Sequence, residues 1–508
     1  MSTESYTEDA LVQQTTAEYM EHQLGWDSVY AYNNEGFGPD SLLGRMSDEE
    51  IVLTRYLRAK LVELNPGLPD AAYEEAIRQI TATVTSQTIV ATNREKHDLI
   101  RDGVHVAFRD DSGELKKERL RVIDFDTPES NHFLCVRELW IKGELYRRRP
   151  DIIGFVNGLP LLFIECKNVH KNLKAAFEKN FSDYKDTIPH IFHHNAIVMF
   201  GNGVEAKIGS ITSQWGHFHE WKRLTEDAPG AVDMETLLKG VCDKRNFLDL
   251  VENFIVFDES LGAPTKILAR NHQFLGVNQA IEAVRDRKVR KGKLGVFWHT
   301  QGAGKSYSMV FFTRKIHRKL GGDFTFVILT DREDLDTQIY KTFAGCGLAD
   351  NDREPCRPTN GAHLEQMLSE HKAFVFSLIH KFSREVDPTQ GYTERDNIIV
   401  ITDEAHRTQY GSLARNMRNA LPNASYIGFT GTPLFKDDEI TKRVFGWYVS
   451  TYDFIRAKED GATVPLYERQ HLNAPSREGG DEKCLLPKAA LLVVNWRHGH
   501  KERQPLCV

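Results

Sequence analysis

The sequence predicts an α/β protein built from at least two domains. The chain has 508 residues, more than one hydrophobic core usually organises. Short apolar runs broken by polar turns begin near residue 103, after an N-terminal region with helical patterning. From about residue 268, continuous apolar runs alternate with helical segments, as in a parallel sheet covered by helices. We therefore expect an α/β domain in the N-terminal half and a parallel-sheet domain in the C-terminal half.

The composition is that of an ordinary soluble globular protein. Hydrophobic residues make up 41% of the chain and charged residues 27%. No run approaches about 18 consecutive apolar residues, and the polar N-terminus lacks the apolar core of a secretory signal, so we expect no membrane association. The seven cysteines form no C-x-x-C pair, which argues against a disulfide framework or a zinc knuckle and favours a cytoplasmic location.

The net charge of −7 argues against a protein that only coats nucleic acid, since such proteins are usually basic. Any contact with DNA must therefore come from local basic runs. The sequence offers such runs at residues 147–149, 285–293 and 314–319. For any single run, a solvated helix face or loop is the simpler explanation.

The N-terminal half is expected to begin with helices and to continue with strands. Helical patterning covers residues 10–35, 48–63 and 72–98. Strands are expected where short apolar runs lie between polar turns, at 105–108, 119–126, 132–139, 151–156 and 161–166. A helix over 171–186 and a strand over 196–203 follow. Residues 215–262 carry few turn signals, and we interpret them as a connecting region.

The C-terminal half is expected to contain buried strands at 294–300, 324–331, 373–378, 397–406 and 425–433. The first of them runs into a G-x-G-K-S loop formed by Gly302, Gly304, Lys305 and Ser306. Its glycines let backbone N–H groups turn toward phosphate oxygens, and the following helix adds its dipole. Lys305 would reach the β- and γ-phosphates, and Ser306 would hold Mg²⁺. His299 stands where the broader pattern has its first glycine.

A second element strengthens the interpretation as a nucleotide site. The strand at 397–406 ends in the sequence Asp403-Glu404-Ala405-His406. A carboxylate at the C-terminal end of such a strand lies at the same sheet edge as the phosphate loop, where Asp403 can bind Mg²⁺ through water. Glu404 beside it can orient or deprotonate the attacking water.

The loop and the DEAH sequence together resemble a superfamily 2 helicase-type motor, whose first lobe is RecA-like. The resemblance adds His406 to the nucleotide-binding set and assigns the reading of adenine to Gln273. It also implies that 329–338 contacts DNA and that Thr430 and Thr432, within "FTGTP", couple hydrolysis to movement. The phrases "DEAHRTQYG", "DREDLDTQ" and "FTGTP", and the passage at 445–468, most closely resemble the motor-nuclease subunit of type I restriction enzymes.

The N-terminal half offers a second candidate active site, within "RRRPDIIGFVNGLPLLFIECKN" at 147–168. Asn157-Gly158 is a strong hairpin-turn signal, and Asp151 and Glu165 are equidistant from residue 158, so they are expected near each other. The odd loop length leaves the register open by one residue. Lys167 leaves the same strand face as Glu165. The two carboxylates would bind Mg²⁺, and the lysine would steady the attacking hydroxide or the developing charge.

This set resembles the PD-(D/E)xK nuclease core. In the type I family a Q-xxx-Y pair follows the lysine on a helix. Tyr184 matches the tyrosine of that accessory pair, and Asn180 stands where the family has glutamine. Glu18 or Glu21, on the first helix, is a further candidate carboxylate for the metal site, although a solvated helix face explains them equally well.

The resemblance covers roughly residues 15–468 and implies the restriction subunit of a type I restriction-modification system, which uses ATP and Mg²⁺. Its implied partners are double-stranded DNA and the methyltransferase and specificity subunits. The expected domains are a PD-(D/E)xK endonuclease domain at 1–215, the connecting region at 216–262, a RecA-like motor lobe at 263–468 and a tail at 469–508.

The tail at 469–508 neither resembles the family nor shows helical or strand periodicity. We therefore expect the second RecA-like lobe to be missing, and the 508-residue chain to bind ATP weakly without translocating DNA. Two other functions stay open. One is a superfamily 2 helicase or remodeller without nuclease activity, and the other is an inactive remnant.

Overall fold

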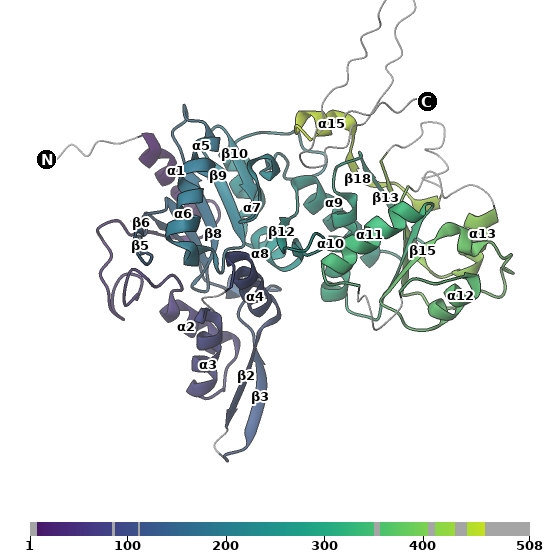
Figure 1. Cartoon of the computed structure of the whole chain (residues 1–508), viewed down its shortest axis with the longest axis horizontal. Helices are drawn as coiled ribbons and strands as arrows, with labels where there is room; N and C mark the ends of the chain where they lie inside the picture. The colour runs from purple at the N-terminus through teal and green to yellow at the C-terminus, as the bar shows by residue number, and fades with distance from the viewer. Residues whose placement is uncertain are drawn as a thin grey trace, which may run out of the picture.

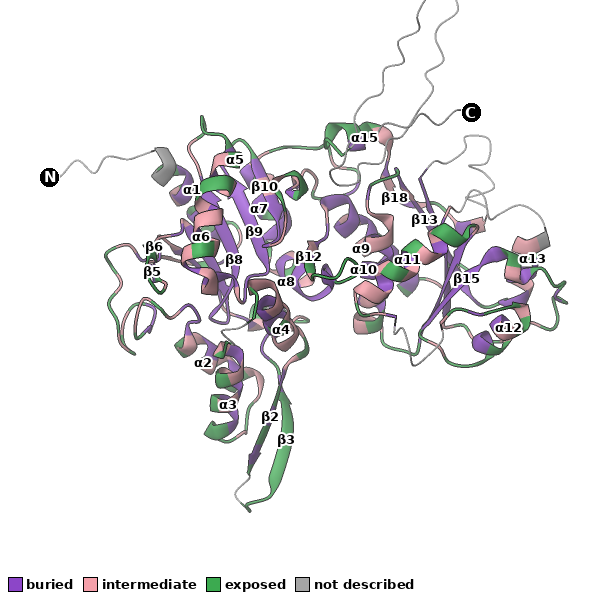
Figure 2. Ribbon diagram, in the orientation of Figure 1, coloured by how far each residue is buried: buried purple, intermediate pink, exposed green. Residues whose placement is uncertain are grey.

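The computed structural model describes residues 8–83, 87–109, 112–349, 356–404, 412–431 and 444–462. They form two α/β halves, each built on a six-stranded sheet, with α7, α8 and β12 between them (Figure 1). Strands of both sheets are buried along most of their length, as Figure 2 shows in purple. The fold class expected from the sequence, a mixed α/β architecture with parallel strand pairing, is confirmed.

The sheet of the N-terminal half has the order β1-β4-β7-β8-β9-β10 and is mixed, with β1·β4 and β8·β9 parallel and the other pairs antiparallel. The elements of this half are α1 (Glu8–His22), β1 (Asp27–Tyr30), α2 (Thr54–Leu64), α3 (Asp70–Thr81), α4 (Ile89–Asp102), β2 (Val104–Arg109), β3 (Leu115–Leu120), η1 (Pro128–Ser130), β4 (Phe133–Arg137), β5 (Ile141–Lys142), β6 (Arg147–Arg148), β7 (Ile152–Val156), β8 (Leu159–Cys166), α5 (Leu173–Ala175), η2 (Ala176–Phe181), α6 (Ser182–Thr187), η3 (Pro189–Phe192), β9 (Ile197–Gly201), β10 (Ala206–Gly209) and η4 (Trp215–His217).

Four expectations for this half were wrong in extent. The helix expected over 48–63 begins only at Thr54. The helix expected over 10–35 ends at His22, because Gly25 adopts a left-handed φ of 68° and the chain then enters β1. The segment 72–98 is divided between α3 and α4, and the Thr88 side chain caps the second helix. The strand expected over 119–126 stops at 120. Beyond it, the side chains of Asn65 and Asn131 accept the backbone N–H groups of Arg121 and Asp124 in place of a neighbouring strand.

The sheet of the C-terminal half has the order β15-β14-β16-β17-β13-β18, and all of its pairs are parallel. Its elements are α9 (Asn271–Arg285), β13 (Lys293–His299), α10 (Lys305–Lys319), β14 (Thr325–Thr330), α11 (Glu333–Gly345), α12 (Gly361–Ser369), β15 (Phe374–Leu378), η5 (Ile379–Phe382), β16 (Ile398–Thr402), α13 (Ser412–Ala420), β17 (Ser425–Thr430), β18 (Tyr448–Tyr452) and α15 (Phe454–Glu459). Because the pairs are parallel, the C-terminal ends of β13, β16 and β17 meet at one edge.

The region between the sheets is folded and packs against both halves. It contains α7 (Met234–Val241), α8 (Lys244–Asn253) and the hairpin of β11 (Ile255–Asp258) with β12 (Thr265–Leu268), which spans the boundary expected at 262/263. Trp26 packs edge-on against Phe133 and Phe247, and its indole N–H donates to the carbonyl of Cys242 at 2.9 Å. One hydrophobic core therefore runs from the first sheet into the second.

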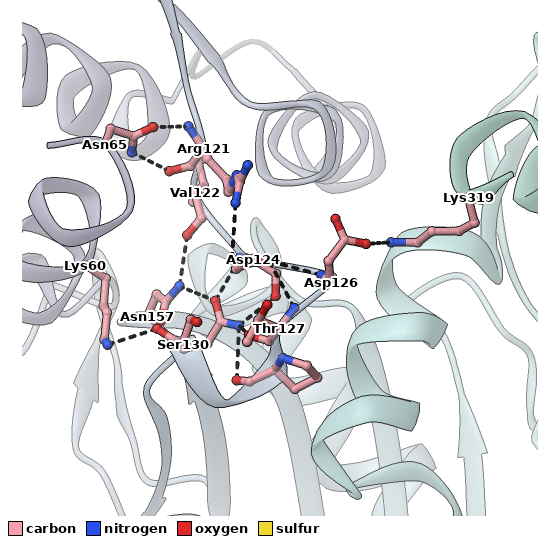
Figure 3. A network of polar contacts seen from close by, with 12 residues as sticks. Lys60, Asn65, Arg121, Val122, Asp124, Asp126, Thr127, Ser130, Asn157 and Lys319 are labelled. Carbon is pink, nitrogen blue, oxygen red and sulfur yellow. Dashed lines mark hydrogen bonds and ion pairs between the residues drawn. The ribbon is translucent and has the colours of Figure 1, made fainter. Parts of the chain in front are cut away.

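A polar network ties the β7–β8 turn to the C-terminal half (Figure 3). The side chain of Asn157 donates to the carbonyl of Val122 and to Asn131 Oδ1, both at 2.9 Å. Asn131 in turn accepts from the backbone of Asp124. In the same segment, the carboxylate of Asp126 pairs with Lys319 at 2.8 Å, at the end of α10. The turn and α10 are thus connected through residues 122–131.

Gly158, the second residue of that turn, is expected to tolerate no side chain. Its φ is +81°, and an added Cβ would lie 2.4 Å from the carbonyl oxygen of Leu53. We expect Gly158→Ala to lower the free energy of unfolding by about 2–4 kcal/mol. Gly67 is the matched control, because its φ is +83° and its Cβ would meet nothing within 4 Å. Gly67→Ala should cost only about 1 kcal/mol. Equal losses in urea denaturation would contradict the steric argument.

Candidate functional site

The β7–β8 hairpin places Asp151 opposite Glu165. The turn at Asn157-Gly158 pairs Val156 with Leu159, as the sequence predicts. A bulge between Gly154 and Phe155 then shifts the register by one residue, so that Ile152 faces Ile164. One step further along the strands, Asp151 and Glu165 are opposite each other. The bulge therefore resolves the register that the odd loop length had left open.

The side chains of this pair are held by neighbours from three different elements. Asp151 accepts the backbone N–H of Cys166 at 2.7 Å and the amide of Gln13, from α1, at 2.8 Å. Glu165 is fully buried, and its Oε1 accepts from Lys167 at 2.9 Å. The same oxygen accepts from the amide of Asn180. The hairpin thus brings Asp151, Glu165 and Lys167 together, with Asn180 as a fourth member.

The electrostatics of the pair disfavour two negative charges. Burial, and then the nearby charge of Glu165, raise the pKa of Asp151 well above its usual value. Burial also raises the pKa of Glu165, and Lys167 opposes that rise. A fully buried and a half-buried carboxyl group beside each other repel when both are ionised, and a bound cation would relieve that repulsion. In addition, Glu165 Oε2 is buried and has no hydrogen-bond partner among the residues that the structure describes, which leaves an oxygen available to a ligand.

The residues around the hairpin therefore fit a divalent metal. The fit rests on two carboxylates, because the described part of the chain contains no group of three or more His, Cys, Asp or Glu residues that could hold a metal ion. Asp151 and Glu165 are the carboxylates that would hold it. Glu18 and Glu21 are exposed on α1, and Glu18 accepts from Gln14, so the structure does not bring them into this set.

Sequence reasoning missed Gln13, which reaches the site from α1. The signal that could have found it is helical spacing, since Gln13 lies on the buried face of α1 with Ala17 and Met20. Asn180 lies in the π-helical turn η2, which follows directly on α5. A π-turn carries an additional residue, and such turns are frequent at functional sites. Tyr184 is buried beside the site, and burial and both carboxylates raise its pKa.

The phosphate loop lies between β13 and α10. Gly302 and Gly304 have φ values of 85° and 83°, a conformation that glycine adopts without strain. Gly304 caps α10, whose first residue is Lys305, so the loop opens onto the N-terminal end of that helix. The ammonium of Lys305 donates to the carbonyl of His299 at 3.3 Å. Ser306 follows in the first turn of the helix.

His299 replaces the first glycine of the broader pattern and lies inside the sheet. It is fully buried, and its Nε2 pairs with Ser450 Oγ on β18 at 2.7 Å. Burial holds the pKa of His299 well below its usual value, so the ring is neutral.

The carboxylates expected at the sheet edge follow β16 directly. Burial raises the pKa of Asp403 to about 6, and the charge of Lys305 opposes the rise. Within the described part of the chain, the buried Asp403 Oδ1 has no hydrogen-bond partner. Glu404 has a φ of 50°, which is uncommon for a residue with a side chain. Thr430 ends β17 at the same edge and is buried. His406 and Thr432 lie outside the described residues.

Gln273 contacts the phosphate loop from α9. Its amide nitrogen donates to the carbonyl of Gly304 at 2.9 Å, and its oxygen accepts from the backbone of Arg270 at 2.8 Å. The side chain of Gln273 therefore connects the phosphate loop to α9 through hydrogen bonds. A cavity of about 380 Å³ adjoins these residues and is also lined by Gly302 and Tyr307.

The raised pKa of Asp403 predicts a pH-dependent stability. A carboxyl group whose pKa rises from 3.8 to about 6 on folding destabilises the protein by up to about 3 kcal/mol once it is ionised. Without Mg²⁺, Asp403→Asn is therefore expected to raise Tm at pH 7. The gain should shrink as the pH falls through about 6 and vanish below about 4.

Asp396→Asn is a suitable control in the same measurement, because Asp396 is exposed and its only ion pair among the described residues, with Lys288, is long at 3.6 Å. The control should show no such pH dependence. A Tm of Asp403→Asn below that of the parent at pH 7 would contradict the electrostatic account.

Comparison with known proteins bears on both sites. A family model described as "Type I restriction enzyme R protein N terminus" matches residues 5–217, and one described as "SWI2/SNF2 ATPase" matches 272–483. The hairpin pair lies within the first match. The phosphate loop and the carboxylates after β16 lie within the second.

The most similar relatives include the type I restriction enzyme HindI endonuclease subunit of Haemophilus influenzae. It is 36% identical over 485 residues, which cover 90% of this chain and 45% of that protein. The putative type I restriction enzyme MjaIXP endonuclease subunit of Methanocaldococcus jannaschii is 30% identical over 463 residues, or 84% of this chain and 42% of that protein. The chain therefore spans somewhat less than half the length of these relatives.

Among solved structures, a fragment of a putative HsdR subunit of a type I restriction enzyme from Vibrio vulnificus aligns with 81% of this chain and 59% of that chain. The identity is 17% and the TM-score is 0.26, so this alignment is too weak to support a structural conclusion.

Within the described residues, no helix combines the length and the apolar character that crossing a membrane requires.

Proposed function

Because the chain is a relative of type I restriction enzyme endonuclease subunits, with residues 5–217 in the R-protein N-terminal family and 272–483 among the SWI2/SNF2 ATPases, we propose that it serves as the restriction subunit of such a system. In this proposal, it cleaves double-stranded DNA in a reaction that depends on ATP. Cleavage away from the recognition site would follow from ATP-driven translocation of DNA, to which this chain would contribute the nuclease and an ATP-binding lobe.

The observation that carries the proposal is the pairing of half-buried Asp151 with fully buried Glu165, joined by Lys167 within the region that matches the R-protein N terminus. A structural hairpin would not need two coupled carboxyl groups with raised pKa values. Ionising these carboxyl groups in the fold lowers stability unless a bound ligand offsets the cost, which supports a functional role for the pair.

At the hairpin, Asp151 and Glu165 would hold Mg²⁺, a hard cation that prefers carboxylate oxygens. The metal, when bound, would polarise the scissile phosphate and acidify a water. Lys167 hydrogen-bonds to Glu165 in the ligand-free chain, and its ammonium would stabilise negative charge at the same point. Asn180 and Gln13 would orient the two carboxylates through the amide contacts described above.

At the second site, the backbone N–H groups at Gly302 and Gly304 and the start of α10 would bind the phosphates of ATP. Lys305 would contact the β- and γ-phosphates, while Ser306 and Asp403 would hold Mg²⁺. Glu404 would orient the attacking water. The proposed roles of Gln273, with a donor and an acceptor for adenine, and of His406, Thr430 and Thr432 rest on the resemblance.

The proposed partners are double-stranded DNA and the methyltransferase and specificity subunits, which would supply recognition of the target sequence. The test is cleavage of circular duplex DNA by the complex reconstituted with these subunits. We expect cutting that requires Mg²⁺. Asp151→Asn should abolish cutting while ATP binding is unchanged. Cutting by Asp151→Asn at the parent's rate would overturn the nuclease assignment and leave a motor without nuclease activity.

A further inference from the structure

Four arginines gather where the two halves meet, away from both candidate sites. Arg94 and Arg101 lie on α4 of the N-terminal half, whereas Arg314 and Arg318 lie on α10 of the C-terminal half. All four line one cavity of about 420 Å³, together with Asp98 and His317. The run at 314–319 is one of the basic stretches that the sequence offers for contact with DNA.

The two helices differ in how their arginines are neutralised. Arg94 pairs with Glu259, and Arg101 pairs with both Asp98 and Asp102. Arg314 and Arg318 form no ion pair with any residue that the structure describes. Arg314 donates to the carbonyl of Ile255 at 3.5 Å. Arg318 donates to the backbone carbonyl of Glu252. The carboxylate of Glu252 forms an ion pair with Lys319 at 2.7 Å.

The surroundings of Arg314 and Arg318 disfavour their charged forms. Burial, followed by the charges of Arg318 and Arg101, lowers the pKa of Arg314 to about 9. Burial and Arg101 lower the pKa of Arg318 to about 10. His97 on α4 is a buried neighbour of these arginines. Its pKa falls well below its usual value because of burial and of nearby cations, which include Arg101, Arg314 and Arg318.

We infer that the cavity between α4 and α10 binds a phosphate group, with Arg314 and Arg318 as its principal donors. A guanidinium presents its N–H groups in a fork that matches phosphate oxygens, and two of them converge here from successive turns of one helix. Arg94 and Arg101 line the opposite side of the cavity. The phosphate belongs either to the DNA backbone or to a small phosphorylated molecule, and the two sources share this chemistry.

A bound phosphate would also stabilise the contact between the halves, because its donors come from α4 and α10 together. Its site differs from that of the phosphate loop, which lies at the opposite end of α10 from Arg314 and Arg318. The inference does not depend on the proposed function, since it rests only on the cavity and its charges.

The test uses the full chain in a Lys305→Ala background, which weakens phosphate binding by the loop. Inorganic pyrophosphate is titrated while Tm is recorded, and a short fluorescent DNA duplex is titrated while anisotropy is recorded. Arg314→Gln, Arg318→Gln and the double variant are compared with Arg78→Gln. Arg78 is an exposed helical arginine that pairs with Glu75, outside the cavity.

We expect the double variant to bind pyrophosphate about 10–100-fold more weakly than the background chain, with Arg78→Gln unchanged. Weaker binding of pyrophosphate alone identifies a small phosphorylated ligand, whereas weaker binding of DNA identifies the backbone as the source. Unchanged affinity for both probes would overturn the inference.

The ligand-free variants provide a second readout. Because the charged arginines are disfavoured in the fold, Arg314→Gln and Arg318→Gln should raise Tm or leave it unchanged without ligand. An arginine with a merely structural role would behave in the opposite way. A clear fall in Tm for both single variants would therefore also overturn the assignment.

Discussion

The Glu165→Gln variant is expected to lose metal-dependent DNA cleavage by about 10²–10⁴-fold, because Lewis-acid stabilisation of the transition state is worth several kcal/mol. Glutamine keeps the size of the side chain and an oxygen that can accept from Lys167 and Asn180. It removes only the negative charge that a metal requires. Cleavage should be measured in the reconstituted complex with Mg²⁺ and with Mn²⁺.

The same variant should fold at least as stably as the parent. Burial raises the pKa of Glu165, so ionising this carboxyl group lowers stability, and the cost grows as the pH rises from the unfolded-state pKa through the folded-state pKa. Tm without metal should therefore rise or stay level. The Tm measurement therefore distinguishes a catalytic loss from a folding defect.

Glu178→Gln, on the neighbouring helical turn, is the control, since Glu178 is half exposed and pairs with Lys174. Full cleavage by Glu165→Gln would contradict the assignment.

Replacing Lys305 is expected to have the second-largest effect. Lys305→Ala should weaken ATP binding by about 10–100-fold, because a hydrogen bond from a charged donor contributes about 1.5–3 kcal/mol. The same ammonium contacts the phosphates and not the base, so any triphosphate should be affected. Binding is measured with a fluorescent ATP analogue.

Lys239→Ala is the control for this variant, because Lys239 is exposed on α7, away from the loop. GTP should lose as much affinity as ATP, since Lys305 contacts phosphates and not the base. Unchanged ATP affinity in Lys305→Ala would show that the loop is not the nucleotide site.

The part of the nuclease site that depends on local sequence could be predicted. Asn157-Gly158 marks the turn, and both residues adopt the positive φ values, 50° and 81°, that a tight hairpin requires. Alternation along β8 places Glu165 and Lys167 on one face. The bulge near Gly154 could not be predicted, because no local pattern distinguishes it, yet it decides which residue faces Glu165.

Contacts between distant segments were the part that sequence reasoning missed. Gln13 reaches Asp151 across 138 residues, and the π-turn that carries Asn180 to Glu165 has no sequence signature of its own. The region interpreted as a connector forms two helices and the first strand of a hairpin within the shared core, since its apolar residues pack against both sheets. Tertiary packing, which leaves only a weak trace in the sequence, determines these features.

Calcium is the most direct probe of the claim that Asp151 and Glu165 form a divalent-metal centre, because it prefers carboxylate oxygens. The measurement is isothermal titration of Ca²⁺ into the nucleotide-free Lys305→Ala chain, with and without Asp151→Asn and Glu165→Gln. The account predicts saturable binding in the Lys305→Ala chain and its loss in either added variant. A binding isotherm that both additional substitutions leave unchanged would contradict it.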